Sequence, residues 1–548
     1  MKKIILSTLF FASLSVGVAQ AQSIYDAIRF SQNYYEGTAR FTSMGGAFSA
    51  LGGDFTSLSI NPAGLGVYRG YEFMMTNGLS YSSTKTSYEN VANAGDSKTT
   101  FGIPSMGFVY PFHWNDGSNK GLISLNLGFG YNKMNNFNYN AKAAGRNIGW
   151  QKSMIGSFLN QTDNILYDYL DISSDRNYDP FTDNNSLYVS DWPVILAWET
   201  SLIDTVPGFY DYYDYLPIFS QQDQLHRTKS SGSSGEYVLS LGANISHKLY
   251  VGLTFGMQDI NHETSSFYKE TMLDAPNPAN PDLFLRDWGY EQHYRTEGFG
   301  YNLKVGLIYR PIPELRLAFA AHTPTWFDLR DSYQATMWSN FHDGYRSQVT
   351  TPTNYFDYRL NTPYKLIGGI AYTFKQYGLI SVDYEFVDYA STKMKDDVNY
   401  YGDNSFSTEN QIIKNTLKGA SNVRVGLEAN LPANFVLRAG YSYYGSPYKS
   451  KGDRDSYFNS QGVNPYYETG SNGELATEGY SMGIGDNHSN VFSAGVGYRF
   501  GAGYIDFAYA TTRTETTYFF DSYRYGVLSS ATTKNNFNRF ILTLGFRF

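Results

Sequence analysis

The sequence predicts an all-β protein, a transmembrane barrel of antiparallel strands, and three observations support that prediction. Aromatic and charged residues each make up 17% of the 548 residues, and the chain contains 50 Tyr and 52 Gly. An ordinary soluble domain has about 25% charged residues. From about residue 68 onward, apolar and polar residues alternate, as in strands with one apolar and one polar face. The mean hydropathy of −0.39 argues against a bundle of membrane helices.

The first 21 residues are predicted to be a secretory signal peptide. Lys2 and Lys3 form a positive start, residues 4–18 are apolar, and Ala19-Gln20-Ala21 matches the cleavage pattern. A retained membrane anchor is the alternative, and the shortness of the apolar stretch argues against it. No later apolar run approaches the ~20 residues of a membrane helix. We therefore expect an exported protein that is cleaved after Ala21.

Charge and residue usage argue against several other classes of protein. Lys and Arg number 42 against 50 Asp and Glu, a net charge of −8, and no basic run appears, so we expect no nucleic-acid partner. The absence of Cys excludes disulfides, thiolate metal sites and a lipoprotein anchor. The eight His show no metal-binding spacing. We therefore predict a protein that is not an enzyme and holds no cofactor or metal. The acidic stretch Asp171–Asn185 lacks the EF-hand spacing, and a solvated loop is favoured over a calcium site.

The polar face of the alternating segments distinguishes a membrane barrel from a soluble sandwich. Ile123, Leu125 and Leu127 alternate with Ser124 and Asn126. Gly, Ser and Asn dominate the polar face, whereas a sandwich in water usually carries Lys, Glu and Thr there. Segments of about 10 residues with an apolar outer face are typical of outer-membrane barrels. Because backbone groups in lipid find no water, such a sheet must close on itself.

Counting such segments predicts an even number of strands, 14, within residues 67–548. Short connectors alternate with long ones, so short periplasmic turns and long extracellular loops are expected, with both termini in the periplasm. The short connectors are Trp114–Asn119, His247-Lys248, Pro311–Glu314, Gln376-Tyr377, Pro432-Ala433 and Gly501-Ala502. The predicted strands are 68–83, 99–113, 120–137, 235–247, 249–262, 297–311, 315–328, 361–375, 378–390, 421–431, 434–447, 489–500, 503–515 and 536–548.

Residues 22–66 do not alternate and are predicted to fold as a plug inside the barrel. Ser23–Gln32 shows helical spacing of apolar residues, and residues 39–66 are rich in small ones. Glycines there let backbones approach closely, and Asn61 before Pro62 is restricted to an extended or turned conformation. A segment hanging in the periplasm is the alternative. The small residues and the lack of charge runs favour folding inside.

Residues 39–66, which end in Asn61-Pro62-Ala63-Gly64-Leu65, resemble the plug of the FadL/TodX family of outer-membrane transporters for hydrophobic compounds. That family has a 14-stranded barrel closed by an N-terminal hatch with an Asn-Pro-Ala motif. The resemblance implies passive, plug-gated passage of hydrophobic small molecules, above all long-chain fatty acids, across the outer membrane of a Gram-negative bacterium. The route in the family is thought to lead sideways through the wall. The long second outer loop, residues 138–234, departs from the family, so its ligand pocket is not transferred.

Two sets of residues are candidates for function. Trp192–Ile203 is an apolar stretch inside the long loop. It is either an exposed binding patch or a segment packed against its Tyr-rich neighbours, and the sequence favours neither alternative. Thr408–Gly419 is expected to form a short amphipathic helix. The plug and gating candidates are Asn61, Pro62, Ala63, Gly45, Gly46, Gly52, Gly53 and Asp54. The substrate-binding candidates are Trp192, Val194, Ile195, Leu196 and Trp198 of the loop, with Phe48 and Phe55 of the plug.

Charged residues near the predicted periplasmic strand ends are expected to face the lumen, because a charge facing lipid at midplane costs roughly 2–4 kcal/mol. They either wet the lumen or form a polar bed for the carbonyl groups of the plug and for Asp54. These residues are Arg310, Arg316, Glu428, Arg438, Arg499, Arg539 and Arg547.

Other functions remain as alternatives. A surface receptor or adhesin would bind ligands, haem among them, through Tyr-rich loops without transport, and a barrel enzyme would act on lipids. The expected partners are a hydrophobic solute, outer-membrane lipids and the barrel-insertion machinery, which reads a C-terminal aromatic strand such as the one ending in Phe548.

Overall fold

The computed structural model describes most of the chain from residue 24 onward, with several gaps. The predicted signal peptide and the connector Trp114–Asn119 lie outside the described residues. The described residues are 24–88, 92–113, 120–148, 153–162, 165–172, 178–182, 187–205, 212–214, 216, 221–273, 284–396, 406–450, 453, 481–483, 488–520 and 529–548.

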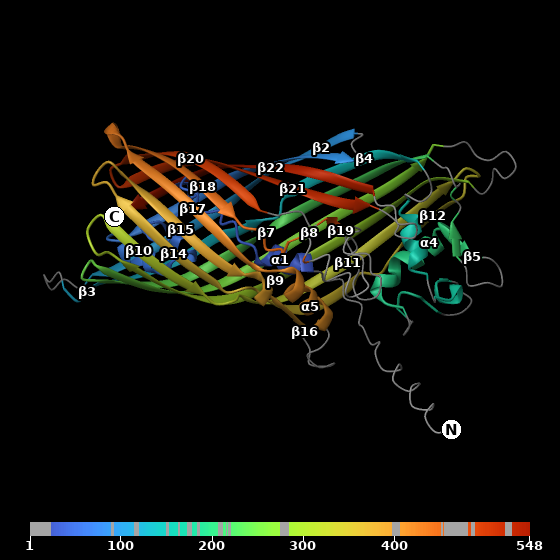
Figure 1. The fold of residues 1–548 in the computed structure, drawn as a ribbon, viewed down its shortest axis with the longest axis horizontal. Coiled ribbons are helices and arrows are strands. Elements are labelled where there is room, and N and C mark those ends of the chain that lie inside the picture. Colours follow the sequence, from blue (N-terminus) through green and yellow to red (C-terminus); the bar gives the residue numbers. More distant parts are fainter. Residues whose placement is uncertain are drawn as a thin grey trace, which may run out of the picture.

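Fourteen antiparallel strands, counted in this described part, close into a barrel, which confirms the predicted fold class (Figure 1). The last strand pairs with the first from Glu72↔Arg547 to Tyr88↔Ala531, so the wall has no free edge at this seam. In order around the wall the strands are β1 (Glu72–Tyr88), β2 (Ala92–His113), β3 (Leu122–Asn136), β7 (Gln221–Ile245), β8 (Leu249–Met272), β9 (Leu285–Tyr309), β10 (Leu315–His322) continued by β11 (Trp326–Phe341), β13 (Asn354–Asn361) continued by β14 (Lys365–Thr373), β15 (Gly378–Asp388) continued by β16 (Lys393–Asp396), β17 (Gly419–Asn430), β18 (Phe435–Tyr444), β20 (Ser489–Phe500), β21 (Gly503–Phe520) and β22 (Ser529–Arg547).

Two neighbouring strands are interrupted at prolines, where the sequence predicted continuous strands over 315–328 and 361–375. Pro324 separates β10 from β11, and Pro363 separates β13 from β14. Proline has no N–H to donate to the ladder. The two interruptions face each other, and Thr325 N donates to Thr362 Oγ1 across them at 2.8 Å. Thr362 N donates to Thr325 O at 3.0 Å, so one side-chain and one backbone hydrogen bond keep the wall closed here.

The outer face carries an apolar band that ends abruptly. On β9, alternate residues from Phe299 to Tyr309 are exposed and apolar, and the next outward residues are Glu297 and Arg295, an ion pair at 2.8 Å. Such a tilted run spans about 25 Å, the height of the apolar band of an outer-membrane barrel. On β3, Ser124 and Asn126 are buried inside while their apolar neighbours face outward, as the alternation predicts.

Smaller elements cover the end of the barrel opposite the C-terminus (Figure 1). We call residues 153–216 the outer cap. It contains α3 (Ile155–Asn160), η4 (Tyr167–Tyr169), η5 (Val189–Asp191), α4 (Trp192–Glu199), β5 (Ile203–Thr205) and β6 (Tyr212–Asp214). The other elements are β4 (Tyr139–Ile148), β12 (Arg346–Thr350), β19 (Ser481–Gly483), η7 (Tyr389–Ser391), η8 (Pro432–Asn434) and α5 (Ser407–Thr416), which is the helix predicted near Thr408–Gly419. None of the described helices is long and apolar enough to cross a membrane.

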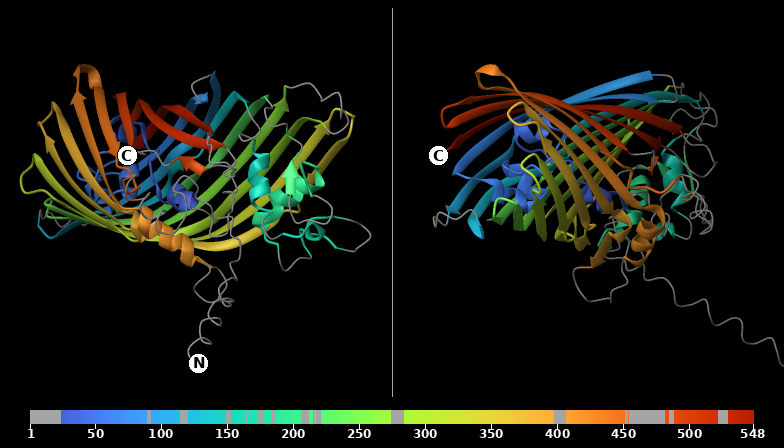
Figure 2. Two further views of the ribbon diagram at one scale, coloured as in Figure 1. Left: turned by 45° about the vertical axis from the view of Figure 1, so that its right-hand side comes forward. Right: turned by 60° about the vertical axis from the view of Figure 1, so that its left-hand side comes forward.

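Residues 24–67 lie within the barrel (Figure 2). They form α1 (Ile24–Ser31), α2 (Ala39–Ser43), η1 (Phe55–Ser59) and η2 (Pro62–Val67). Nearly every residue from 39 to 66 is buried. We call residues 24–67 the plug.

Candidate functional site

The turn at Asn61 joins two parts of the plug to the barrel wall. Its Oδ1 accepts a hydrogen bond from Ala63 N at 3.1 Å and so caps η2. Its Nδ2 donates to Ser49 O at 2.8 Å and to Leu307 O on β9 at 3.3 Å. Pro62 occupies the first position of η2, where no N–H is needed. The Asn61 side chain therefore stabilises the turn and joins it to both the preceding plug segment and the wall.

A row of glycines on three adjacent strands forms the surface on which this turn lies. Gly242 pairs with Gly252, which pairs with Gly306. A Cβ on Gly252 would overlap the Pro62 carbonyl group, and one on Gly306 would overlap Asn61 Oδ1. Only a wall without side chains at these points lets the plug backbone approach so closely. We call these three residues the glycine row.

Two further glycine pairs receive other parts of the plug. Gly107 pairs with Gly130, and the Phe55 ring lies against both, while the pair Gly426 and Gly440 receives the backbone at Met44 and Gly45. None of these wall positions was predicted from the sequence. Their signal was the abundance of glycine on the polar face of the alternating segments.

The predicted plug glycines form tight turns. Gly45, Gly46, Gly52 and Gly53 have φ between +61° and +74°, a left-handed conformation that glycine adopts without steric cost. Gly52 also lies against the backbone of Gly64, because a Cβ there would stand 2.7 Å from Gly64 Cα.

Arginines of the wall donate hydrogen bonds to carbonyl groups of the plug near the C-terminal end of the barrel, as the polar-bed hypothesis expected. Arg316 Nη1 donates to Leu51 O at 2.5 Å, and Arg547 Nη2 donates to Gly53 O at 3.4 Å. Asp54 differs from the hypothesis, because its bonds run to plug residues, Thr38 Oγ1 at 2.6 Å and Thr56 N at 3.0 Å. Its carboxylate caps η1 instead of contacting the arginines of the wall.

Arg40 of the plug takes part in a chain of ion pairs with charged residues of the wall. Arg40 Nε lies 2.9 Å from Glu428 Oε2, and Arg438 Nε lies 2.7 Å from the same oxygen. Arg438 Nη1 continues the chain to Asp506 Oδ1 at 2.7 Å. All four groups are shielded from water, so each charge has a partner of opposite sign where an unpaired one would be costly. Arg310 instead bonds Pro313 O in its own turn.

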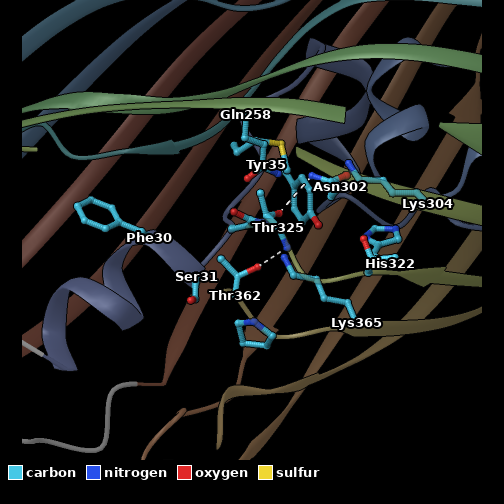
Figure 3. Close-up of a pocket in the computed structure, with 14 residues that line it drawn as sticks. Phe30, Ser31, Tyr35, Gln258, Asn302, Lys304, His322, Thr325, Thr362 and Lys365 are labelled. Carbon is cyan, nitrogen blue, oxygen red and sulfur yellow. Dashed lines mark hydrogen bonds between the residues drawn. The ribbon is translucent and has the colours of Figure 1, made fainter. Parts of the chain in front are cut away.

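A cavity lies where the plug faces the two proline interruptions (Figure 3), and we call it the proline cavity. Tyr35 of the plug faces Lys304, His322 and Lys365 across it. His322 Nε2 lies 2.8 Å from Ile60 O, so this nitrogen donates its hydrogen to the plug. Lys304 Nζ is paired with Glu236 at 2.5 Å.

The charges around the proline cavity are balanced. Arg424 Nη2 lies 3.0 Å from Glu385 Oε1, and its guanidinium lies between the rings of Tyr35 and Tyr444, 5.5 Å from each. Asp383 accepts hydrogen bonds from Ser49 N and Oγ of the plug at 2.8 and 2.6 Å. Lys304 and Lys365 line the cavity itself, whereas the buried residues Arg424, Glu236, Glu385 and Asp383 lie outside its lining.

A second cavity lies on the other side of the lumen, and we call it the bulge cavity. Thr76 pairs with Ser105 and Gly78 with Gly102, so β2 holds one more residue than β1 between these pairs, a β-bulge at Ile103-Pro104. Its lining residues are Glu36, Gly78, Ser80, Thr100, Phe101, Gly102, Pro104, Lys133, Asn138, Arg539 and Ile541.

The outer cap buries the apolar stretch that was considered as an exposed patch. Val194, Ile195 and Leu196 of α4 are fully buried, and Trp192 packs nearly parallel to the Tyr333 ring at 6.2 Å. Trp198 is partly buried against the same cluster. Of the two alternatives, an exposed patch and a self-packed segment, the structure shows the self-packed segment. The acidic segment Asp171–Asn185 lies partly outside the described residues.

One carboxylate anchors the cap to the barrel. Glu270 of β8 is fully buried and accepts hydrogen bonds from Ser153 Oγ at 2.6 Å and Met154 N at 3.1 Å. Gln224 Nε2 and Trp288 Nε1 donate to it from the wall at 2.8 and 2.9 Å. The first residues of the cap are therefore held by a carboxylate whose two oxygens both accept hydrogen bonds.

Both plug phenylalanines serve packing in this structure. Phe48 lies 5.4 Å from the Phe41 ring, with the Arg40 guanidinium 5.3 Å from its centre. Phe55 lies on the glycine pair of β2 and β3. Their contact with a substrate, like that of the α4 residues, stays a prediction.

No family model and no curated protein matches the sequence. Solved structures of similar overall form include the Pseudomonas putida toluene transporter TodX, at 14% identity and a TM-score of 0.47, with 94% of this chain and 99% of that chain covered. A Pseudomonas aeruginosa FadL homologue gives 12% identity and a TM-score of 0.49, with 93% and 98% covered. The Ralstonia pickettii toluene transporter TbuX gives 15% and 0.46, with 94% and 99% covered. Similarity at this level does not by itself assign the chain to their family.

Proposed function

We propose that this chain is an outer-membrane protein of the FadL/TodX type that passes hydrophobic small molecules, above all long-chain fatty acids, by plug-gated diffusion. The support is the plug, which fills the lumen of a closed barrel with an apolar outer band. A straight aqueous path is blocked by segments bonded to the wall on several sides, from β9 to β22. An open porin would leave that path free.

The plug motif supports the same proposal at the level of residues. Asn61, Pro62 and Ala63 form the contact between plug and wall, and the wall is shaped for them by the glycine row. The bulge cavity supports a sideways route, because it lies at a β-bulge of the wall and one of its lining residues, Phe101, is 72% exposed. A solute on such a route would leave the barrel directly into lipid.

Uptake into cells tests the proposal. A Gram-negative host that lacks its own long-chain fatty acid transporter would express the protein and receive a labelled long-chain fatty acid. We expect label inside the cells and growth on the fatty acid as sole carbon source, with host cells carrying an empty plasmid as the control. Label that stays at the cell surface would favour the receptor alternative.

That alternative has one observation in its favour. Tyr167, Tyr169 and Tyr213 of the outer cap are exposed, and tyrosines are common in protein binding surfaces. A receptor would bind haem or another surface ligand through this cap. Surface binding that removal of the cap abolishes, together with unchanged fatty acid uptake, would establish a receptor role beside transport.

A further inference from the structure

Beyond the apolar band, the outer face of the barrel carries charged side chains, and on one half of the wall they are paired across the strands. Arg330 lies directly opposite Asp357 on β11 and β13 and donates two hydrogen bonds to its carboxylate, at 2.7 and 2.9 Å. Arg359 lies opposite Asp328 on the same strands and donates to it at 3.0 Å. Opposite charges in such positions stabilise a sheet, whereas like charges repel each other.

On the other half of the wall, the same kind of position holds two cations. Lys142 of β4 lies directly opposite Arg227 of β7, and burial alternates so that both side chains are on the outer face. Neither forms an ion pair with an acid in the part of the chain that the structure describes. Four residues further along β4, Arg146 lies opposite Asp223 and forms an ion pair at 2.8 Å. The repulsion at Lys142 and Arg227 is therefore a local departure from the pairing of the wall, and a bound anion would remove it.

A second row of cations lies on neighbouring strands. Lys85 of β1 lies directly opposite Lys534 of β22, and both side chains are exposed on the outer face. Glu515 of β21 lies 3.5 Å from Lys534, so one acid faces two cations. Lys229, the next outward residue after Arg227 on β7, is also exposed. We call five residues the cationic arc: Lys85, Lys142, Arg227, Lys229 and Lys534.

The two rows of the arc lie on one side of the barrel, at the height of lipid head groups. β22, β1 and β2 pair in that order, and Thr84 Oγ1, beside Lys85, donates to Asn140 O of β4 at 2.8 Å (Figure 1). On β1, the last exposed apolar residue is Tyr81, four residues before Lys85. Four residues of a tilted strand rise by about 10 Å. The arc therefore lies just outside the hydrocarbon, at the end of the barrel opposite the C-terminus.

The charge of the arc does not follow from composition. The whole chain has a net charge of −8, yet these five cations have one acidic partner, Glu515, within the described residues. Several cations spread over neighbouring strands fit an anion that carries several separate charges. Phosphate groups fit best, because an arginine binds them through two parallel hydrogen bonds and lysines bind them as point charges.

We propose that the cationic arc binds the phosphate groups of lipopolysaccharide, the phosphorylated glycolipid in the outer leaflet of the outer membrane. This inference rests on the outer-membrane location given in the proposed function, and it does not depend on transport. The acyl chains of the glycolipid lie against the apolar band, so its phosphates are held beside the wall just above that band. An acidic soluble protein would instead have to reach this surface through the sugar layer.

Binding of lipopolysaccharide to the purified protein in nonionic micelles tests the arc. The two ligands are a rough lipopolysaccharide and the same molecule after removal of its phosphates, which share their acyl chains and differ in charge. We expect the phosphorylated form to bind at least about tenfold more tightly, the gain of one charge-assisted hydrogen bond. Lys142→Gln with Arg227→Gln and Lys229→Gln should remove that preference.

The matched control neutralises three cations of the paired half, Arg295→Gln with Arg330→Gln and Arg359→Gln. It changes the net charge by the same amount and should keep the preference for phosphate. Loss of the preference in this control as well would show that net charge and not the arc attracts the glycolipid, which would overturn the inference.

A second variant tests the other row of the arc. Lys85→Gln with Lys534→Gln should weaken binding of the phosphorylated form and leave the other form unchanged. Heat-dependent migration on a gel checks folding, and this pair replaces the triple variant if the latter does not fold. Equal affinity of the unmodified protein for both forms, or tighter binding of polyglutamate than of lipopolysaccharide, would overturn the inference. Fatty acid uptake is measured separately, and intact uptake would then leave the proposed function standing, whereas absent uptake would overturn that function whatever the arc binds.

Discussion

The plug and the outer cap both fill an end of the same barrel, but they are held by opposite means. The plug lies on wall positions that have no side chain, so its backbone touches the backbone of the strands. The cap is held by large side chains, with Trp192, Phe158 and Trp288 in one buried cluster. A side chain added at one of these glycines would overlap the plug. The aromatic cluster of the cap, by contrast, loses stability gradually as side-chain atoms are removed.

The two regions differ in polarity as well. Plug contacts with the wall include Arg316, Asp383 and Glu428, each bonded to a plug group. Among the described residues of the cap, Glu270 is the charged wall group that bonds its first residues, and the hydroxyl groups of Ser339 and Ser347 donate to the carbonyl groups of Thr200 and Glu199. The plug is therefore positioned by direction-dependent bonds at many points, and the cap mainly by apolar burial. This difference can be tested through the permeability of the barrel, from the largest expected effect to the smallest.

Removing the plug should have the largest effect. Deletion of residues 24–60 leaves the closed ladder of the wall intact, because the strands pair with one another. It also removes the groups that fill the lumen. We expect large, stable conductance steps in planar bilayers and rapid swelling of liposomes in small sugars. A deletion variant that folds and remains as tight as the full chain would show that the plug does not block the lumen.

Adding a side chain at the glycine row should come next. Gly252→Leu would place its Cβ into the Pro62 carbonyl group, and a strand backbone cannot move away without breaking its ladder. We therefore expect the plug to be displaced and conductance to appear, below that of the deletion. Planar-bilayer recordings of the purified variant measure this.

The matched control for that variant is Gly368→Leu on β14. Nothing lies within 4 Å of the Cβ position of Gly368, so the same added side chain should leave the barrel closed. Conductance from both variants would mean that the effect comes from glycine loss in a strand, and conductance from neither would mean that the glycine row does not hold the plug.

The strands were predictable from sequence because alternation is a local property. Alternation predicts which face of β3 Leu125 and Asn126 occupy. It also predicts that the last strand pairs with the first. The interruptions at Pro324 and Pro363 were not predicted, since each proline stands among residues that otherwise alternate. Their consequence depends on the neighbouring strand, where Thr362 bonds Thr325 through both its hydroxyl group and its backbone N–H.

The candidate site was predictable only in part. Asn61 and Pro62 were identified by their motif, and the plug glycines by their clustering. Which wall residues receive them depends on contacts between segments hundreds of positions apart, such as Asn61 with Leu307. Composition likewise could not tell whether Trp192–Ile203 is exposed or packed, because an apolar loop segment fits both until its neighbours are known.

Loosening the Asn61 turn should have a smaller effect than adding a side chain. Asn61→Ala with Pro62→Ala removes the cap of η2, worth about 1 kcal/mol, and the bond to Leu307. Other plug contacts remain, so we expect brief openings in bilayer recordings and altered fatty acid uptake, with a folded barrel on a gel. The control pair is Asn430→Ala with Pro432→Ala, at the turn between β17 and β18, where Asn430 Nδ2 donates to Gln376 O of the neighbouring turn. Openings in the control pair alone would contradict this role of Asn61.

Truncating a buried side chain of the cap should have the smallest effect on permeability. Trp192→Ala removes a buried indole from the cluster around Tyr333, a change that costs about 3–5 kcal/mol in a protein core. The loss falls on the cap, because the wall strands beneath it keep their ladder and Glu270 still holds Ser153 and Met154. Limited proteolysis of intact cells should therefore cleave within residues 153–216 faster than in the unmodified protein, while planar bilayers show no new conductance. Tyr213→Ala, an exposed aromatic of the same cap, is the control and should leave the cleavage rate unchanged. Conductance from Trp192→Ala would mean that the cap supports the plug, and the two ends of the barrel would then be coupled rather than held independently.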